Sequence, residues 1–155
     1  AAGLFFLADG NTVGNVARWN GTTWVSPGQG LNGTVNSLAV LIDGSLLAGG
    51  SFTASGTTPM SFLARWDGAG WSSFGGGTTG DVNALAVAAN GDVYVGGGFV
   101  GATPANATGI ARWNGASWSN LGSGTTNPVH AIGFTATGDL VIGGLFVAVS
   151  GVPAL

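Results

Sequence analysis

The chain has 155 residues, of which three are basic, six are acidic and none is cysteine, and its net charge is −3. Charged residues make up 6% of the chain, against roughly a quarter of an average domain, so they are too few to cover ordinary helical surfaces. Three cationic side chains cannot neutralise the phosphates of a nucleic acid or an anionic membrane surface, and the absence of cysteine excludes disulfides and thiolate metal sites.

The predicted elements are short strands joined by tight turns. Residues 16–19 and 23–26 are expected to form one hairpin. Residues 35–40 alternate at period two, and Asp43-Gly44 supplies a turn into residues 46–52, which predicts a second hairpin. After a loop rich in Ser, Thr, Gly and Pro, residues 62–66 and 71–74 predict a third.

These elements recur at an interval of 47 residues. The tripeptide Ala-Arg-Trp stands at 17–19, 64–66 and 111–113, and the hairpin of 35–52 returns at 82–99 and 129–146. The recurring structural positions are Arg18, Trp19, Trp24, Gly50, Phe52, Arg65, Trp66, Trp71, Gly97, Phe99, Arg112, Trp113, Trp118, Gly144 and Phe146. We predict a single repeat domain over residues 1–155, with units at about 1–47, 48–94 and 95–141; residues 142–155 repeat the register of residues 1–14.

Four antiparallel strands in a unit of this length are typical of a blade in a β-propeller, so the predicted fold class is all-β with propeller-like blades. The paired glycines near Gly50 would let an inner strand approach its neighbours closely. The tryptophans are expected to fill the space between blades. A β-trefoil, which also has three repeats, is the alternative.

The repeat also resembles a known group of proteins. Residues 17–52 follow the pattern ARWNG-x-x-W-x-x-x-G-x-G and then V-x-x-LAV-x-x-DG-x-L-x-x-GG-x-F. This pattern is similar to the propeller-type repeats of surface proteins secreted by bacteria and of the ectodomain of the fungal cortical polarity marker. The resemblance spans the whole chain and implies a propeller outside the cell or at its surface.

The number of units raises the question of closure. A closed propeller has roughly 4 to 8 blades, so three units predict either part of a longer propeller or an assembly of several chains. Residues 3–7 and 144–148 are two candidates for the same strand. In an assembly one of them is surplus and available to pair with another chain, which favours a ring or an open polymer.

Nothing in the sequence indicates catalysis, a metal site or a cofactor. His130 is the single histidine, has no inferred nucleophile or acid beside it, and is interpreted as a polar strand residue. The aspartates lie mostly in turns, where they serve the backbone. The three recurring arginines are expected to stack on aromatic rings or to bond carbonyl oxygens. The glycine runs 75–77 and 96–98 lack the lysine and helix of a phosphate loop.

We therefore expect a non-enzymatic, extracellular or cell-surface β-repeat protein with a structural or adhesive role. It would self-assemble into a ring or filament by completing blades between chains through its terminal strands. The alternative is a carbohydrate-binding, lectin-like propeller module. The expected partner is another copy of the chain, or glycans under the alternative. The longest apolar stretch, residues 141–155, is interrupted by glycine and proline and is shorter than the roughly 18 residues that span a bilayer, so no membrane insertion is predicted.

Overall fold

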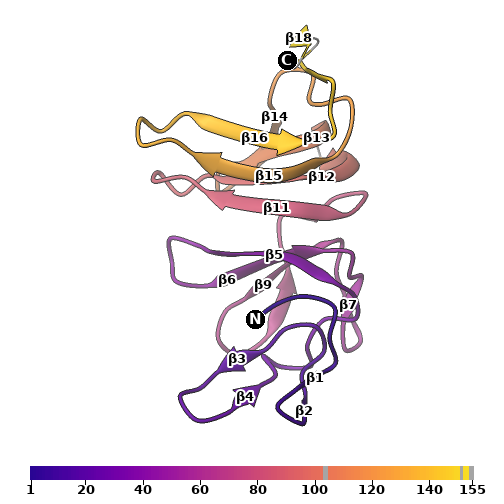
Figure 1. Ribbon diagram of the computed structural model, residues 1–155, viewed down its shortest axis with the longest axis vertical. Helices are drawn as coiled ribbons and strands as arrows, with labels where there is room; N and C mark the ends of the chain where they lie inside the picture. The colour runs from indigo at the N-terminus through magenta and orange to yellow at the C-terminus, as the bar shows by residue number, and fades with distance from the viewer. Residues whose placement is uncertain (103–104, 151, 154–155) are drawn as a thin grey trace.

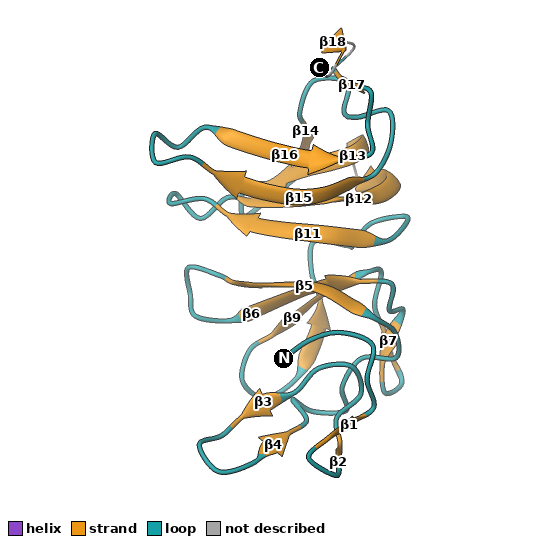
Figure 2. Ribbon diagram, viewed as in Figure 1, coloured by secondary structure: helices purple, strands orange, loops and turns teal. Residues whose placement is uncertain are grey.

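The computed structural model describes residues 1–102, 105–150 and 152–153, and within these ranges the protein is all-β without a helix (Figure 2). The all-β prediction is therefore confirmed. The strands are β1 (Leu7–Ala8), β2 (Asn11–Thr12), β3 (Arg18–Trp19), β4 (Trp24–Val25), β5 (Val35–Val40), β6 (Leu46–Gly50), β7 (Ala54–Ser55), β8 (Thr58–Pro59), β9 (Leu63–Trp66), β10 (Trp71–Ser73), β11 (Val82–Val87), β12 (Val93–Ala102), β13 (Ala105–Trp113), β14 (Trp118–Asn120), β15 (Val129–Phe134), β16 (Leu140–Gly144), β17 (Ala148–Val149) and β18 (Val152–Pro153).

Two four-stranded antiparallel sheets form the centre of the molecule. One has the order β5-β6-β9-β10 and the other the order β11-β12-β13-β14. In each sheet adjacent strands are antiparallel and succeed one another in chain order, and in the first sheet the connection from β6 to β9 contains the small sheet β7–β8. The two sheets also share a register shift at the same place, between Val35 and Ser37 in one and between Val82 and Ala84 in the other.

Two-stranded sheets flank this centre. The pair β3–β4 has the register of β9–β10, with Trp19 opposite Trp24 as Trp66 is opposite Trp71. The pair β15–β16 has the register of β5–β6. The pair β3–β4 thus resembles the last two strands of a four-stranded sheet. The pair β15–β16, near the other end of the described residues, resembles the first two strands.

The sheets lie in a row, with the strands β5, β11 and β15 side by side (Figure 1). A buried apolar cluster fills the space between the two four-stranded sheets and includes Leu47, Val82 and Leu85. A second cluster, with Val35, Phe52 and Trp71, joins the first sheet to the N-terminal region. Within the described ranges no sheet closes on itself.

Small hairpins occupy the loops between second and third strands, a feature that the sequence pattern does not predict. They are β1–β2, β7–β8 and β17–β18. In the central unit β12 and β13 extend to Ala102 and from Ala105, so a long hairpin stands where a loop is expected after Phe99. The backbone N–H and C=O groups of these segments form hydrogen bonds in the hairpins. The segments are therefore regular strands although their residues are mostly polar.

Candidate functional site

The most distinctive geometry lies at the junctions between successive sheets. The recurring positions fall there as follows: Arg18 and Trp19 on β3, Trp24 on β4, Gly50 at the end of β6 with Phe52 after it, Arg65 and Trp66 on β9, Trp71 on β10, Gly97 and Phe99 on β12, Arg112 and Trp113 on β13, Trp118 on β14, and Gly144 at the end of β16 with Phe146 after it.

A ladder of amide side chains links the first strands of neighbouring units. The Nδ2 atom of Asn36 donates to the carbonyl oxygen of Val82 at 3.0 Å, and that of Asn83 donates to the carbonyl oxygen of Val129 at 3.2 Å. His130 holds the next position and is exposed. The interpretation of His130 as a polar strand residue agrees with this placement, and its two counterparts show that the position faces the next unit.

Glycine makes room for the apolar contact across each junction. A Cβ atom at Gly96 would lie 2.6 Å from a methyl carbon of Val129, and one at Gly49 would overlap Val82 in the same way. The side chain of the following unit therefore sits directly on the glycine. At Gly143, the third counterpart, a Cβ would meet only the Cβ of Ala131 at 3.8 Å. This glycine is uncovered in the described part of the chain.

An ion pair joins the β5–β6 turn to the strand β9 in the first four-stranded sheet. Arg65 places Nη2 2.5 Å from Oδ2 of Asp43, and its Nε donates to Oγ of Ser45 at 2.9 Å. The hydroxyl and backbone N–H of Ser45, followed by the Arg65 charge, hold the pKa of Asp43 below its ordinary value. Both partners are roughly half exposed, so the pair adds little to stability and mainly fixes the arginine.

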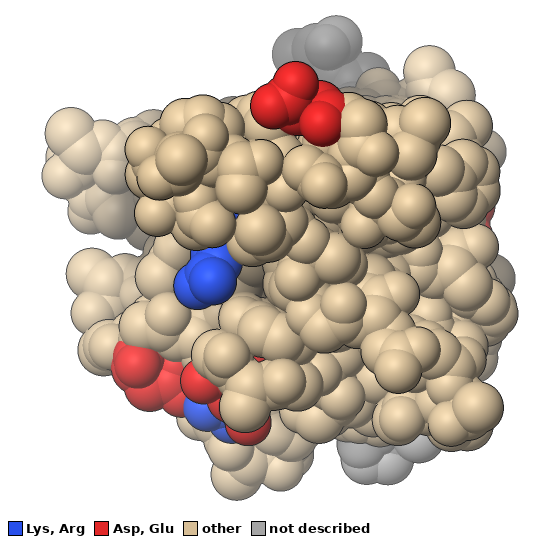
Figure 3. All heavy atoms as spheres, turned by 90° about the horizontal axis from the view of Figure 1, so that it is seen from below, with Lys and Arg blue, Asp and Glu red and all other residues tan. Residues whose placement is uncertain are grey.

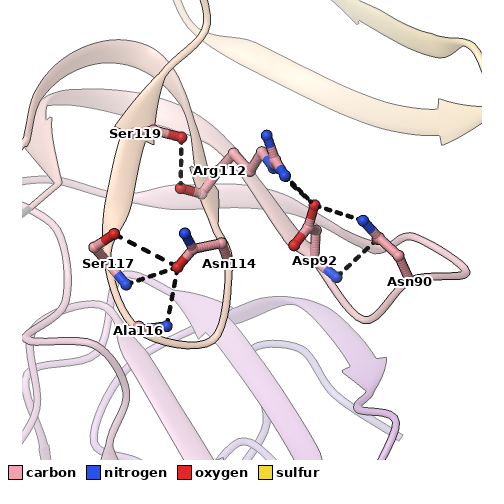
Figure 4. Close-up of polar contacts among 7 residues, drawn as sticks. All are labelled: Asn90, Asp92, Arg112, Asn114, Ala116, Ser117 and Ser119. Carbon is pink, nitrogen blue, oxygen red and sulfur yellow. Dashed lines mark hydrogen bonds and ion pairs between the residues drawn. The ribbon is translucent and has the colours of Figure 1, made fainter.

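The second four-stranded sheet has a more buried version of the pair (Figure 4). Asp92 is only 7% exposed and accepts from Nε of Arg112 at 2.7 Å and from Nδ2 of Asn90 at 2.8 Å. The Asn90 amide is the main cause, and Arg112 a further one, of the lowered pKa of Asp92. The expectation that these arginines stack on rings or bond carbonyls is wrong for Arg65 and Arg112, which pair with carboxylates.

The tryptophans pack against the preceding unit. The indole Nε1 of Trp71 donates to the carbonyl oxygen of Pro27 at 2.9 Å, and that of Trp118 donates to the carbonyl oxygen of Gly75 at 2.7 Å. The rings of Phe74 and Trp113 lie 5.7 Å apart across the same junction. Trp71, Trp113 and Trp118 thus contact the preceding unit, while Trp19 is 51% exposed.

Each of the two flanking sheets carries only one partner of the arginine–aspartate ion pair. Arg18 and Asp139 occupy the positions of Arg112 and Asp92, and neither forms an ion pair within the described residues. Both are exposed. The molecule shows few charged side chains elsewhere, and the face in Figure 3 is mostly uncharged.

Hollows open between units on the side of the Asp-Gly turns. One of about 360 Å³ is lined by Arg65 and Asp43 together with Phe74 and Trp113, and by Ser72 and Ser73. Larger ones of about 560 and 530 Å³ lie at the neighbouring junctions. An ion pair beside aromatic rings provides both hydrogen bonds and a stacking surface.

The hollows are not accompanied by a cluster of metal-binding side chains in the described ranges. In the part of the chain that the structure describes, no group of three or more His, Cys, Asp or Glu side chains is placed to hold a metal ion. His130 and the aspartates lie on separate turns and strands. No helix capable of crossing a bilayer occurs in residues 1–102, 105–150 or 152–153.

Comparison with known proteins gives no relative. No protein-family model matches the chain, and no curated protein or solved structure is significantly similar to it.

Two features of the junctions have a signal in the sequence, although sequence patterns alone did not predict them. The ladder is visible as asparagines 47 residues apart, at 36 and 83. The ion pairs are harder to find, because Asp43 and Asp92 stand at different distances before their arginines; Asp92 aligns with Ser45 and not with Asp43. Only the folded hairpin shows that both carboxylates reach the same guanidinium position.

Proposed function

We propose that the sheets are blades of a β-propeller and that the protein is a non-enzymatic structural component of the cell exterior, which self-associates by completing blades between chains. The order of strands in each sheet supports blades over a β-trefoil, since adjacent strands follow one another along the chain. The low charge supports self-association, because electrostatic repulsion between copies is weak. The resemblance of the repeat to secreted surface propellers supports an extracellular location.

One observation carries this proposal. The outer edge of β16 has no neighbouring strand among the described residues, whereas its counterparts β6 and β12 pair on both sides. Val141 on this strand is 53% exposed, while its counterpart Leu47 is fully buried. An exposed apolar strand edge is a template for pairing with another chain.

The first test is the native mass of the 155-residue chain in dilute solution, by light scattering coupled to size exclusion, with negative-stain images of the same sample. We expect a particle of at least two chains. Val141→Lys should shift it toward a single chain, because a charge would enter the new interface. Val100→Lys is the matched control, since Val100 is 75% exposed on a strand that is already paired on both sides. A folded single chain at all concentrations would refute self-association.

A second candidate function follows from the hollow beside Arg65 and Trp113. A saccharide ring could stack on the indole while its hydroxyls bond the ion pair and the serines lining the hollow. This is the carbohydrate-binding alternative. A glycan array at high protein concentration tests it; binding lost in Trp113→Ala would support a lectin role, and an array without binding would count against it.

A further inference from the structure

Two of the hollows between units have equivalent linings and share an ion pair. The first hollow, of about 560 Å³, lies at the junction of β3–β4 with the first four-stranded sheet, and the second hollow, of about 360 Å³, lies at the junction of the two four-stranded sheets. We propose that they form one groove for an extended, uncharged oligosaccharide, with a sugar ring on a tryptophan in each. This inference rests on the second candidate function, carbohydrate binding, and specifies the ligand.

The lining of the first hollow returns one repeat later in the second hollow. Five pairs of lining residues stand 47 residues apart: Arg18 and Arg65, Gly44 and Gly91, Leu46 and Val93, Trp66 and Trp113, and Gly68 and Gly115. In each hollow the arginine belongs to one unit and the tryptophan to the next. Each hollow therefore offers the same combination of a guanidinium and an indole, and a ligand with repeating sugar units can use both in the same way.

The two hollows adjoin at one ion pair. Asp43 and Arg65 belong to the lining of both hollows, and their side chains are 48% and 40% exposed. Arg65 uses Nε for Oγ of Ser45 and Nη2 for Asp43, while its Nη1 donates no hydrogen bond within the part of the chain that is described. A ligand that passes from one hollow into the other would cross this pair, where hydroxyl groups can accept from the guanidinium and donate to the carboxylate.

The tryptophans that line the hollows are held by neighbouring rings. Trp66 lies 5.5 Å from Trp71 and Trp113 lies 5.3 Å from Trp118 between ring centroids, with interplanar angles of 52° and 57°. Trp66 and Trp113 are both half-buried, so part of each indole remains accessible. An aromatic surface that is already fixed loses little freedom on binding, and the apolar C–H face of a sugar ring can stack on it.

The charges that line the groove balance, which favours an uncharged ligand. The first hollow has Arg18 and Arg65 against Asp43 and Asp67, and the second hollow has Arg65 against Asp43. A charged group on the ligand would meet a like charge close to each opposite one, so it gains little from electrostatic attraction. The hydroxyl groups of a neutral sugar can bond to both kinds of side chain without this repulsion.

The dependence of affinity on ligand length tests the groove. Isothermal titration calorimetry of the 155-residue chain would use linear β-1,4-linked oligomers of glucose, mannose and N-acetylglucosamine with one to six sugar units. In at least one series the six-unit oligomer should bind at least about 10-fold more tightly than the two-unit oligomer, because a second ring contact becomes intramolecular. Cationic glucosamine oligomers and anionic galacturonate oligomers of the same lengths should bind at least about 10-fold more weakly than the neutral series.

A substitution that fills the second hollow has a matched control one repeat later. Ser72 lines the second hollow, whereas its counterpart Ser119 lines neither hollow. Both serines are exposed, and each hydroxyl donates to a backbone carbonyl oxygen at 3.4 Å, that of Arg65 or of Arg112. Ser72→Leu should bring the affinity for the six-unit oligomer to within about 3-fold of that for the two-unit oligomer, and Ser119→Leu should leave it unchanged.

The first hollow is tested in the same way. Val40 is 65% exposed and lines the first hollow, while Val100 is 75% exposed and lines neither. Val40→Lys places a long charged side chain in the first hollow and should also remove the advantage of the six-unit oligomer, whereas Val100→Lys should retain it. Circular dichroism and thermal melting of each variant confirm that the fold is kept.

The outcomes separate this inference from the function on which it rests. Binding that increases with length and is lost in both Ser72→Leu and Val40→Lys would support the groove. Binding of short glycans with no gain from length, or a gain that only one of the two variants removes, would overturn the groove and leave a single sugar site standing. Tighter binding of the charged oligomers would overturn the uncharged ligand. The absence of binding to every oligomer and on the glycan array would overturn both the groove and the carbohydrate-binding function.

Discussion

The close approach of strand and loop at Gly97 gives the sharpest stability prediction. A Cβ atom there would overlap the carbonyl oxygen of Asp81 and lie 3.0 Å from the Cα of Val82. Both obstacles are backbone atoms, so a change of side-chain rotamer cannot relieve the overlap. The same carbonyl accepts a hydrogen bond of 3.0 Å from the N–H of Gly98, and any movement of the loop would weaken that bond.

Gly97→Ala should therefore cost more than a typical overpacked residue. Extra methyl groups in packed interiors cost about 1–3 kcal/mol, and a clash with fixed backbone belongs at the upper end, at about 3 kcal/mol. For a chain of this length that corresponds to a fall in melting temperature of about 6–12 °C. Thermal unfolding followed by tryptophan fluorescence, at one fixed protein concentration, measures it.

The adjacent glycine is the control. A Cβ at Gly98 would lie 3.7 Å from Cγ of Pro128, an ordinary contact, and neither Gly97 nor Gly98 has a positive φ. Gly98→Ala should therefore melt close to the original protein. If the two variants melt within about 2 °C of each other, the close approach does not exclude a side chain and the reasoning is refuted.

Three further predictions concern polar groups. Asn15 is fully buried at a φ of 66° and bonds backbone groups through both ends of its amide, so Asn15→Ala should cost about 2–3 kcal/mol in urea denaturation; a smaller loss than for an exposed asparagine would contradict this. Asp92 has a lowered pKa, chiefly through the amide of Asn90. Its contribution to the free energy of unfolding is therefore present above the ordinary carboxyl pKa of about 3.9 and is lost as the pH falls through the lower pKa of the folded state. Asp92→Asn should make the free energy of unfolding depend less on pH on the acid side, and an unchanged pH dependence would argue against this. Trp118→Phe leaves a carbonyl without its indole donor and should cost about 1–2 kcal/mol, whereas Trp24→Phe, whose indole forms no hydrogen bond among the described residues, should cost less.

Much of the fold could be predicted because local rules and the repeat agreed. Alternating residues before Asp43-Gly44 specify a hairpin with little ambiguity, and the structure has it as β5 and β6. Identical spacing then transfers this hairpin to β11–β12 and β15–β16. Turn chemistry and strand periodicity act over a few residues, which is the range in which sequence reasoning is strongest.

The features that were missed depend on contacts between distant residues. The hairpin β7–β8 forms in a segment rich in Thr and Ser because Asn32 anchors it. The side-chain oxygen of Asn32 accepts hydrogen bonds from two backbone N–H groups at its start, and the backbone N–H of Asn32 donates to the carbonyl oxygen of Ala54. The pairing of Arg112 with Asp92 depends on the strand register that brings positions 20 residues apart together. Neither the β7–β8 hairpin nor the Arg112–Asp92 pair can be predicted from composition or residue spacing alone.

The meander order of the strands has a consequence for how the protein folds. Within each four-stranded sheet the strands pair in chain order, and the connection from β6 to β9 contains the hairpin β7–β8. Closing loops of these lengths costs little entropy. Proteins with mostly local contacts fold quickly, and an all-β protein is usually slow because its pairings are distant. We predict that the pairing of strands within each sheet precedes the docking of neighbouring sheets. Refolding should therefore show a fast phase within sheets and a later one as the tryptophans become packed against the preceding unit.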